Sequence, residues 1–406
     1  MRVVLVLDVF PKVSTTFIVN KFVGLLERGV DVHVACWTSE PKVWATFPQL
    51  AAPELRRRVH VVPTARRPLA AAKLASTLAP SVLGRGGRTK SIHSPLHAWL
   101  AALAPDLVHF EFGARAARYL HPGQRFAYPV LVSFRGYDLN CAGLDVPGFY
   151  DGVWEAADAL HLLGNDLWRR AQERGCPVDK PHVLIPPAVN AELFTPDPRT
   201  AEVVGGVERP LRLLSVGRLH WKKGYEWALQ AVRSLLDNGL AIDYHLVGDG
   251  HDRESVVARI DELDLANYVR LLGAQPRTVV EEQLQWADVF VHPAVSEGFC
   301  NAVMEAQAME VPVVCTDADG LAENVVDGHT GLVVGRRDPV ALAGAIDRLA
   351  ANPQLRAQFG RAGRRRVVEK FRPEVQIDAF LDLYERVSRT GVRPRSTEAP
   401  GVRRAG

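Results

Sequence analysis

The sequence predicts an α/β protein built from two Rossmann-like domains. Short β-branched runs alternate with amphipathic helical patterns along nearly the whole chain, which is typical of parallel sheets covered by helices on both faces. A stretch rich in proline and glycine separates two such series near the middle of the chain. The 406 residues, 47% of them hydrophobic, supply enough apolar material for two cores of ordinary domain size.

The first domain is expected to span residues 1–190. Its first helix is predicted over residues 16–28, where Gly29 ends the helical pattern. Its strands are predicted from short apolar runs rich in β-branched residues. These runs are residues 3–7, 32–35, 59–62, 107–110, 130–134, 159–163 and 182–185.

The second domain is expected to span residues 191–372, after a segment with little periodicity. Its buried strands are predicted at residues 211–216, 244–247, 269–272, 289–292 and 311–315. Three helices follow in succession, over residues 338–351, 353–370 and 373–389. All three have proline at or next to their start, where its missing N–H group costs nothing.

The helix predicted over residues 373–389 is too apolar for a solvent helix at the end of a finished domain. Its apolar residues are Val375, Ile377, Phe380, Leu381, Leu383, Tyr384 and Val387. We therefore expect another part of the protein to cover it. From Thr390 onward Pro, Gly, Arg and Ser dominate, which predicts a disordered tail over residues 390–406.

The formal net charge is only +3, so no global field indicates nucleic acid as a partner. Basic residues nevertheless cluster in one stretch of the first half, with almost no acids between them. They are Arg56, Arg57, Arg58, Arg66, Arg67, Arg85, Arg88 and Lys90. The cluster indicates either a solvated loop with a surface helix, or docking to an anionic membrane face or an acidic acceptor.

The cysteines indicate neither a disulfide framework nor a zinc site, because they are odd in number, scattered and never in a C-x-x-C arrangement. They are Cys36, Cys141, Cys176, Cys300 and Cys315. The apolar start of the chain stops at Asp8, too early for a signal peptide core or a membrane span. We therefore expect a cytoplasmic protein, and the basic cluster adds the option of peripheral contact at the inner membrane face.

Two glutamates follow the strand predicted over residues 289–292. Glu297 lies at the turn into the next helix, and Glu305 lies further along that helix. In an open parallel sheet, ligands bind at the carboxyl ends of strands, and the helix start offers unpaired N–H groups to anions. The two carboxylates can flank a bound polyol and phosphate, since a carboxylate that accepts two hydroxyl protons clamps a sugar. The alternative is a surface helix with two solvated acids.

Arg218 and Lys223 follow the first strand of the second domain, one on each side of a turn. Together they suit a diphosphate that gains charge as a bond to it breaks, and the alternative is a salt-bridged loop. Gly248, in the sequence VGDG, ends the next strand with a bend where the backbone can approach a planar base. This third motif has weak specificity, because glycine-rich strand ends are common.

The order of these motifs resembles the carboxyl-terminal half of family 4 glycosyltransferases, which have the GT-B fold. Between residues 211 and 350 the chain carries GRL-x3-KG, VGDG, HP-x-x-SEGF-x-N-x-x-MEAQA, PVVCTD and DGLAENVVDGHTGLVV, in that order. The segments FPKVSTTFI and SFRGYD of the first domain resemble, more loosely, the branch with colanic-acid and other exopolysaccharide transferases. The resemblance implies that the two domains face each other across a cleft. It also implies that helix 373–389 crosses back onto the first domain.

The resemblance further implies roles for the charged residues of the second domain. The family residue that matches Glu297 contacts the donor sugar, and the one that matches Glu305 holds the nucleotide ribose. The residues that match Arg218 and Lys223 hold the diphosphate.

Backbone groups and one further acid complete the implied donor site. The amides that match Phe299, Cys300 and Asn301 face the sugar and phosphate at the helix start, in agreement with the helix-dipole argument. Glu323 falls where the family often has another acid near the donor pocket.

The first domain departs from the family pattern. Many members have a histidine in a segment like SFHG-x-D, facing the donor sugar, where this chain has Arg135. Arg135 either replaces that function or leaves the contact to another group. Three residues are candidates for contact with the acceptor: Asp138 in the same segment, and His109 and Glu111 at the end of another strand. For a histidine, a core or surface position is the commoner alternative.

Asp317 and Asp319 have the D-x-D form that binds Mg or Mn in transferases of the other major fold. Here they follow the PVV strand, and Arg218 and Lys223 already supply the charge that a metal would bring. We therefore expect no metal and no cofactor.

The sequence thus predicts a retaining glycosyltransferase that moves a sugar from a UDP- or GDP-sugar to an acceptor hydroxyl in polysaccharide, glycolipid or natural-product biosynthesis. Its acceptor is expected to be a small molecule, a glycan or a lipid-linked sugar. A nucleotide-sugar epimerase of the same fold is the alternative, although nothing here resembles its amino-terminal catalytic acids. A dinucleotide-binding oxidoreductase is disfavoured, because residues 7–16 contain no glycine for a G-x-G-x-x-G loop.

Overall fold

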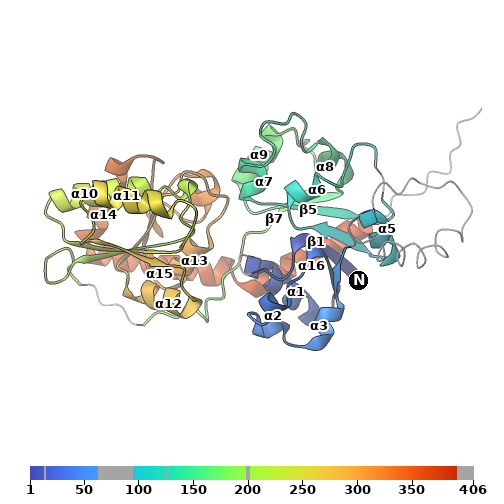
Figure 1. Cartoon of the computed structure of the whole chain (residues 1–406), viewed down its shortest axis with the longest axis horizontal. Helices are drawn as coiled ribbons and strands as arrows, with labels where there is room; N and C mark the ends of the chain where they lie inside the picture. Colours follow the sequence, from blue (N-terminus) through green and yellow to red (C-terminus); the bar gives the residue numbers. More distant parts are fainter. Residues whose placement is uncertain (13–14, 63–94, 125, 198–201, 391–406) are drawn as a thin grey trace, which may run out of the picture.

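The computed structural model describes residues 1–12, 15–62, 95–124, 126–197 and 202–390. These residues form two bodies that lie side by side, each a parallel β-sheet with helices on both faces (Figure 1). Basic residues Arg66 to Lys90 and the predicted tail beyond Thr390 lie outside the described residues. In the described part of the chain, no helix has both the length and the hydropathy needed to cross a membrane.

Within the described residues, the first sheet has seven strands in the order β3-β2-β1-β4-β5-β6-β7, and the neighbouring strands run parallel. The strands are β1 (Arg2–Val9), β2 (Asp31–Thr38), β3 (Val59–Val61), β4 (Leu107–Phe110), β5 (Val130–Phe134), β6 (Ala159–Leu162) and β7 (His182–Leu184). The helices are α1 (Thr16–Glu27), α2 (Pro41–Trp44), η2 (Pro48–Leu50), α3 (Pro53–Arg57), α5 (Pro95–Ala102), α6 (Gly113–Ala116), α7 (Gly136–Asn140), α8 (Asp151–Ala156) and α9 (Asn165–Glu173). Each of these strands lies where the sequence predicts one.

The second sheet, counted over the same described ranges, has six parallel strands in the order β10-β9-β8-β11-β12-β13. The strands are β8 (Leu211–Val216), β9 (Ile242–Val247), β10 (Val269–Gly273), β11 (Val289–His292), β12 (Val313–Thr316) and β13 (Gly331–Val334). The helices are η3 (Trp221–Lys223), α10 (Tyr225–Asp237), α11 (Arg253–Glu262), α12 (Arg277–Trp286), α13 (Asn301–Ala308), η4 (Asp319–Glu323), α14 (Pro339–Ala350) and α15 (Pro353–Lys370). Strand β13 is an element that the sequence patterns did not predict.

Strand β1 illustrates how these sheets are stabilised. The five residues from Val3 to Leu7 are at most 1% exposed. Val3, Leu5 and Leu7 join the apolar cluster on one face of the sheet, whereas Val4 and Val6 join the cluster on the other. Because successive side chains of a strand point to opposite faces, a strand covered on both faces needs a continuous apolar run, as this one has. The alternation of strands and helices is therefore enough to predict two Rossmann-like domains.

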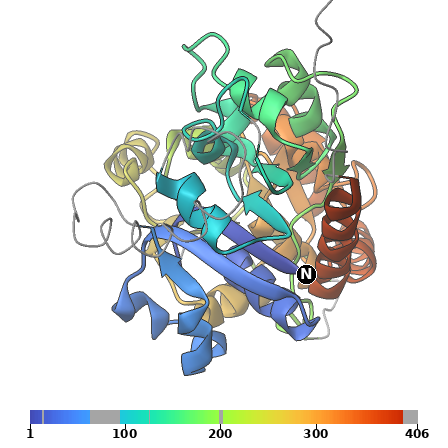
Figure 2. The same ribbon diagram turned by 90° about the vertical axis from the view of Figure 1, so that its right-hand side faces the viewer.

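The last helix, α16 (Pro373–Thr390), leaves the second domain and packs on the first (Figures 1 and 2). Ile377, Phe380, Leu383, Tyr384 and Val387 are buried in the same apolar cluster as residues of β1 and α1. A Cβ atom at Gly24 of α1 would lie 2.9 Å from the Ile377 side chain, so the two helices are in close contact. The apolar face that the sequence left without a partner is thus covered by the first domain.

Candidate active site

A cavity of about 280 Å³ lies between the two domains, at the carboxyl ends of several strands. In open parallel sheets this edge is the usual place for ligands. Lys21, Arg135 and His161 of the first domain line it, as do Arg218 and Glu297 of the second. Gln376 and Phe380 of helix α16 also line it, so the first domain, the second domain and the crossing helix meet at this cavity. The other lining residues are Phe17, Gly136, Tyr137, Asn140, Cys141, Leu163, Pro187, Lys222, Ser296, Gly298, Phe299 and Asn301.

Lys223 and Glu297 form an ion pair in the second domain. Lys223 ends the short helix η3, and Gly224 then turns the chain with a φ of 67°, where an added Cβ would lie 2.0 Å from the Pro293 carbonyl oxygen. This close approach brings the loop after β8 against the loop after β11. Although burial disfavours the charged forms, the Lys223 charge holds the pKa of Glu297 far below its usual range, and Glu297 raises the pKa of Lys223. Two residues predicted from separate motifs are therefore paired.

His292 and Cys300 extend this buried charge cluster, with 4.0 Å between His292 Nδ1 and Cys300 Sγ. Burial opposes charge on both, but their mutual attraction raises the pKa of His292 and lowers the pKa of Cys300. One ligand atom each from His292, Glu297 and Cys300 lies within 4.8 Å of the others, the spacing of a possible metal site. The Lys223 ammonium already occupies the Glu297 carboxylate, so the group suits an internal charge network better than a metal.

Helix α13 begins beside the cavity, but not all of the backbone N–H groups at its start are available to a ligand. Phe299 and Asn301 line the cavity, as expected. The Cys300 amide instead donates to the Asn324 side chain at 3.1 Å, and that side chain donates back to the Cys300 carbonyl. The expected role of the Cys300 amide is therefore wrong for this arrangement, because Asn324 already satisfies it.

Glu305 and Gly248, the predicted nucleotide-binding positions, are not among the described residues that line this cavity. Burial raises the pKa of Glu305 to about 7. Of two charged neighbours on α12, Arg277 lowers this pKa and Glu281 raises it. Gly248 has a φ of 140°, and an added Cβ would lie 1.9 Å from the Gly217 carbonyl oxygen. Glycine at this strand end thus permits close packing of two backbones, whatever ligand binds nearby.

Arg135 belongs to the cavity wall, and a buried network holds it there. Its Nη2 atom lies 3.1 Å from Glu111 Oε2, and its guanidinium stacks 4.1 Å from the ring centroid of Phe17. Glu111 is 0% exposed and also pairs with Lys21. Burial would raise the pKa of Glu111, but the charges of Lys21 and Arg135 lower it. Glu111 was expected to face the acceptor; instead it lies behind the cavity wall and neutralises two cations.

His109 is also buried behind the wall instead of facing the cleft. Its Nδ1 lies 2.8 Å from the Tyr384 hydroxyl of α16, and its Nε2 lies 2.7 Å from the Ser133 hydroxyl. Burial lowers the pKa of His109 well below its usual range, so the ring is neutral. The acceptor role considered for His109 is therefore wrong. His109 is a core histidine, which was the alternative given above.

Asp138 and Glu323 likewise have structural partners. Asp138 is 1% exposed and accepts hydrogen bonds from the backbone N–H groups of Ala114 and Arg135, at 2.9 and 2.8 Å. Burial raises its pKa to about 6. Glu323 reaches across to the first domain and accepts from the backbone N–H groups of Asn165 and Asp166, at 2.9 and 2.8 Å. Glu323 therefore joins the domains and is not part of the described cavity wall.

The polar residues of the cavity wall that the sequence patterns missed include Lys21, Asn140 and Ser296. Lys21 lies on the buried face of α1 between Ile18 and Phe22. A lysine on an otherwise apolar stripe is a signal that could have been used, because charged groups are seldom fully buried unless paired. Asn140 and Ser296 have no comparable signal, since both residues are common in loops.

Residues 199–366 match the family described as glycosyl transferases group 1. The chain is similar to the amylovoran biosynthesis glycosyltransferase AmsK of Erwinia amylovora, with 27% identity over 93% of this chain and 98% of that protein. It is 36% identical to the putative colanic acid biosynthesis glycosyltransferase WcaL of Escherichia coli K12, over 51% of this chain and 50% of WcaL.

The fold resembles that of Anabaena HepE, solved in complex with UDP-glucose. The TM-score is 0.69 at 16% identity, and the match covers 94% of this chain and 100% of HepE. At this identity the likeness concerns the fold alone, and it agrees with the GT-B arrangement of two Rossmann-like domains. The chain therefore carries a glycosyl transferases group 1 domain in its second half and is a glycosyltransferase enzyme.

Proposed function

We propose that this enzyme transfers a sugar from a UDP- or GDP-sugar to an acceptor hydroxyl, with retention of the anomeric configuration and without a metal. The observation that carries the proposal is the ion pair between Lys223 and Glu297, because Glu297 lines the cavity together with Arg218 and Lys223 lies directly behind it. Arg218 and Lys223 supply the positive charge that a departing diphosphate requires. The UDP-glucose bound to HepE supports a donor of this class.

The bond changes follow from the charges around the cavity. The bond between the anomeric carbon and the diphosphate oxygen breaks as the acceptor oxygen bonds to that carbon from the same face. The acceptor proton passes to the departing phosphate oxygen. Glu297 is paired with Lys223, and Glu111 is buried between two cations, so neither carboxylate is suited to act as a nucleophile. Same-face attack is therefore favoured over a covalent double displacement.

The acceptor is proposed to occupy a larger cavity of about 740 Å³, lined mostly by the first domain. Cations outnumber acids along its wall: these cations are Lys12, Arg115, Arg118, Arg135, Arg218 and Lys222. Its two acids already have partners, because Asp8 pairs with Arg115 and Asp138 binds two backbone amides. The excess positive charge favours an acceptor that carries a phosphate or a carboxylate.

The setting proposed for the reaction is polysaccharide, glycolipid or natural-product biosynthesis in the cytoplasm, where free thiols such as Cys36 and Cys300 persist. The exposed basic residues Arg56 and Arg57 at the end of α3 support peripheral contact with the inner membrane face, whereas Arg58 pairs with Asp31. The glycosyltransferase relatives do not favour the alternative of an epimerase.

A thermal-shift panel with UDP, GDP, ADP and TDP tests the donor class. A ligand that binds only the folded state raises its stability in proportion to its affinity, so the correct base gives a selective shift. We expect UDP or GDP to produce it. A panel in which no nucleoside diphosphate shifts the transition would contradict the proposed donor site.

A further inference from the structure

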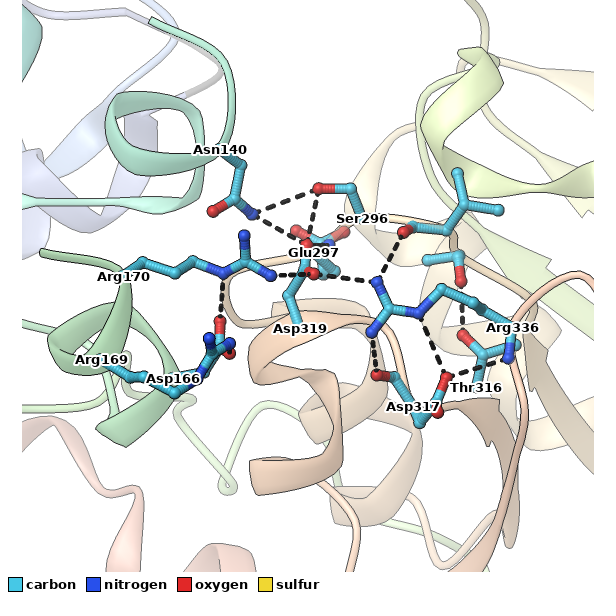
Figure 3. A network of polar contacts seen from close by, with 12 residues as sticks. Asn140, Asp166, Arg169, Arg170, Ser296, Glu297, Thr316, Asp317, Asp319 and Arg336 are labelled. Carbon is cyan, nitrogen blue, oxygen red and sulfur yellow. Dashed lines mark hydrogen bonds and ion pairs between the residues drawn. The ribbon is translucent and has the colours of Figure 1, made fainter. Parts of the chain in front are cut away.

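Asp319, the second acid of the D-x-D motif, lies where the two domains meet (Figure 3). Its side chain is only 3% exposed. Two groups of the first domain donate to it: Arg170 Nη2 of α9 at 2.5 Å from Oδ1, and Asn140 Nδ2 of α7 at 2.9 Å from Oδ2. Asp166 fixes the Arg170 guanidinium through a 2.8 Å contact with its Nε. The first domain therefore places a charge and an amide on one buried carboxylate of the second.

The same carboxylate holds the loop that carries Glu297. Asp319 Oδ2 accepts from the Ser296 hydroxyl at 2.7 Å and from the Glu297 backbone N–H at 3.2 Å. Arg336 Nη1 lies 3.0 Å from Oδ1. Asp319 thus fixes the backbone of Glu297, while Lys223 fixes its side chain.

Two glycines show how close this loop lies to the first domain. A Cβ atom at Gly298 would lie 2.7 Å from the Cα of Gly136, and one at Gly136 would lie 2.9 Å from the Gly298 nitrogen. The backbones of the two domains therefore touch immediately beside Glu297. Any separation of the domains changes the surroundings of this loop and of Asp319 together.

The backbone of Asp319 supports a special role. Its φ is 50°, in the left-handed region that residues other than glycine seldom adopt. Such a conformation persists only where the surroundings determine it, and it is frequent at functional sites. Here the surroundings are five hydrogen-bond donors, two of them from the other domain.

We propose that Asp319 is a positioning residue that couples domain closure to the order of the Ser296–Glu297 loop. When the domains close, Arg170 and Asn140 complete the coordination of the carboxylate, which then holds the Glu297 backbone in place. When they separate, the carboxylate loses both donors and the loop loses part of its support. The functional consequence rests on the proposed function, with Glu297 in the donor-sugar role that the family resemblance implies. The motif that resembles a metal site acts instead as an interdomain clasp.

Hydrogen–deuterium exchange of the full chain tests the coupling without a substrate. Arg170→Gln is expected to speed exchange at residues 296–298 by about tenfold, because contacting residues of one network couple by that order. Arg169→Gln is the matched control, since Arg169 is 54% exposed and its ion pairs among the described residues are with Asp166 and Glu173 of its own helix. Arg170→Lys is expected to restore most of the protection. Equal exchange in Arg170→Gln and Arg169→Gln overturns the proposal.

A double-mutant comparison separates coupling from local structure. In an Asp319→Asn background, adding Arg170→Gln is expected to change the exchange of residues 296–298 little, because the shared contact is already weakened. Additive effects would overturn the proposal. With the donor that the nucleotide panel identifies, Arg170→Gln is expected to lower kcat while leaving the donor KM within about twofold. The exchange result does not depend on donor chemistry, so its failure is distinct from a failure of Glu297→Gln to affect transfer.

Discussion

The ammonium of Lys223 lies against the carboxylate of Glu297, and the two side chains are only 14% and 13% exposed. The pair joins the loop after β8 to the loop after β11, and Glu297 lines the interdomain cavity. Removing one member of such a pair leaves the other as an uncompensated buried charge. The proposed chemistry requires the Lys223 ammonium to contact the diphosphate in addition to Glu297 when a donor binds, which makes the pair its centre.

Lys223→Met is predicted to lower kcat by about 10²–10³-fold, or about 3–4 kcal/mol, the usual effect of losing one group that stabilises developing negative charge. The donor KM should change less, because charge on the diphosphate grows toward the transition state. Steady-state kinetics beside Lys42→Met, which removes an exposed lysine of α2, supply the measurement and its control. A rise in KM with unchanged kcat would contradict the assignment.

Donor affinity is predicted to rise with pH through the titration of Glu305. Burial raises its pKa to about 7, so the carboxyl is protonated below this pH and ionised above it. Only the ionised form accepts two hydroxyl protons from a ribose, so affinity should increase up to about tenfold between about pH 6 and 8. Calorimetric titration with UDP-glucose measures this, because that ligand lacks the terminal phosphate of UDP that titrates near pH 6.

Glu305→Gln is the control for the pH dependence, since an amide of the same size cannot ionise. Its affinity for UDP-glucose should be weaker at high pH and flat across the range. The same rise in both proteins would remove Glu305 from the nucleotide site. Should GDP be selected by the nucleotide panel, GDP-mannose is the corresponding probe.

Leu383→Ala in α16 is predicted to destabilise the full chain by about 2–5 kcal/mol, the usual cost of such a truncation in a core. Leu383 is 2% exposed and packs in the cluster of the first domain. Val375→Ala, on the same helix at 39% exposure, should cost far less. Urea denaturation compares the two. Similar values would mean that α16 does not stabilise the first domain.

Ending the chain at Arg372 extends this test. Loss of α16 should expose apolar surface of the first domain and abolish transfer, while nucleotide binding by the second domain survives in part. Normal activity in the shortened enzyme would contradict the role of the crossing helix.

Activity is predicted to survive EDTA, because the D-x-D acids already have cationic partners. Asp317 Oδ1 lies 3.3 Å from Arg336 Nε, and Asp319 pairs with Arg170 and Arg336. A transfer assay with and without EDTA makes the measurement. Loss of activity that Mg or Mn restores would contradict the metal-free mechanism.

The alternation of strands and helices was sufficient to predict both sheets, because buried parallel strands need continuous apolar runs such as Val3 to Leu7. Strand β13 was missed, since Gly331–Val334 is short and the helix between it and β12 is the five-residue η4. Its partner β12 was placed two residues early, at 311 instead of Val313, because Val311 and Pro312 extend the apolar run ahead of the first residue paired with β11.

Site residues close in sequence to a motif were easier to predict than contacts between domains. Lys223 and Glu297 follow strand ends that meet at one sheet edge, so their proximity follows from topology. The partners of Asp319 and Glu323 could not be predicted, because Arg170 and Asn165 lie on α9 of the other domain and carry no motif. His109 was misplaced because the sequence does not reveal that Tyr384 of the crossing helix covers it.

The configuration of the product's anomeric carbon tests the central claim most directly. NMR of the first product formed from an α-linked nucleotide sugar distinguishes the two outcomes through the one-bond coupling between the anomeric carbon and its proton, which differs between the anomers of both glucose and mannose. Retention, with an α-linked product, is the predicted result, because in the proposed mechanism Arg218 and Lys223 hold the departing diphosphate on the face from which the acceptor attacks. A β-linked product would contradict same-face transfer and require a base on the opposite face of the sugar.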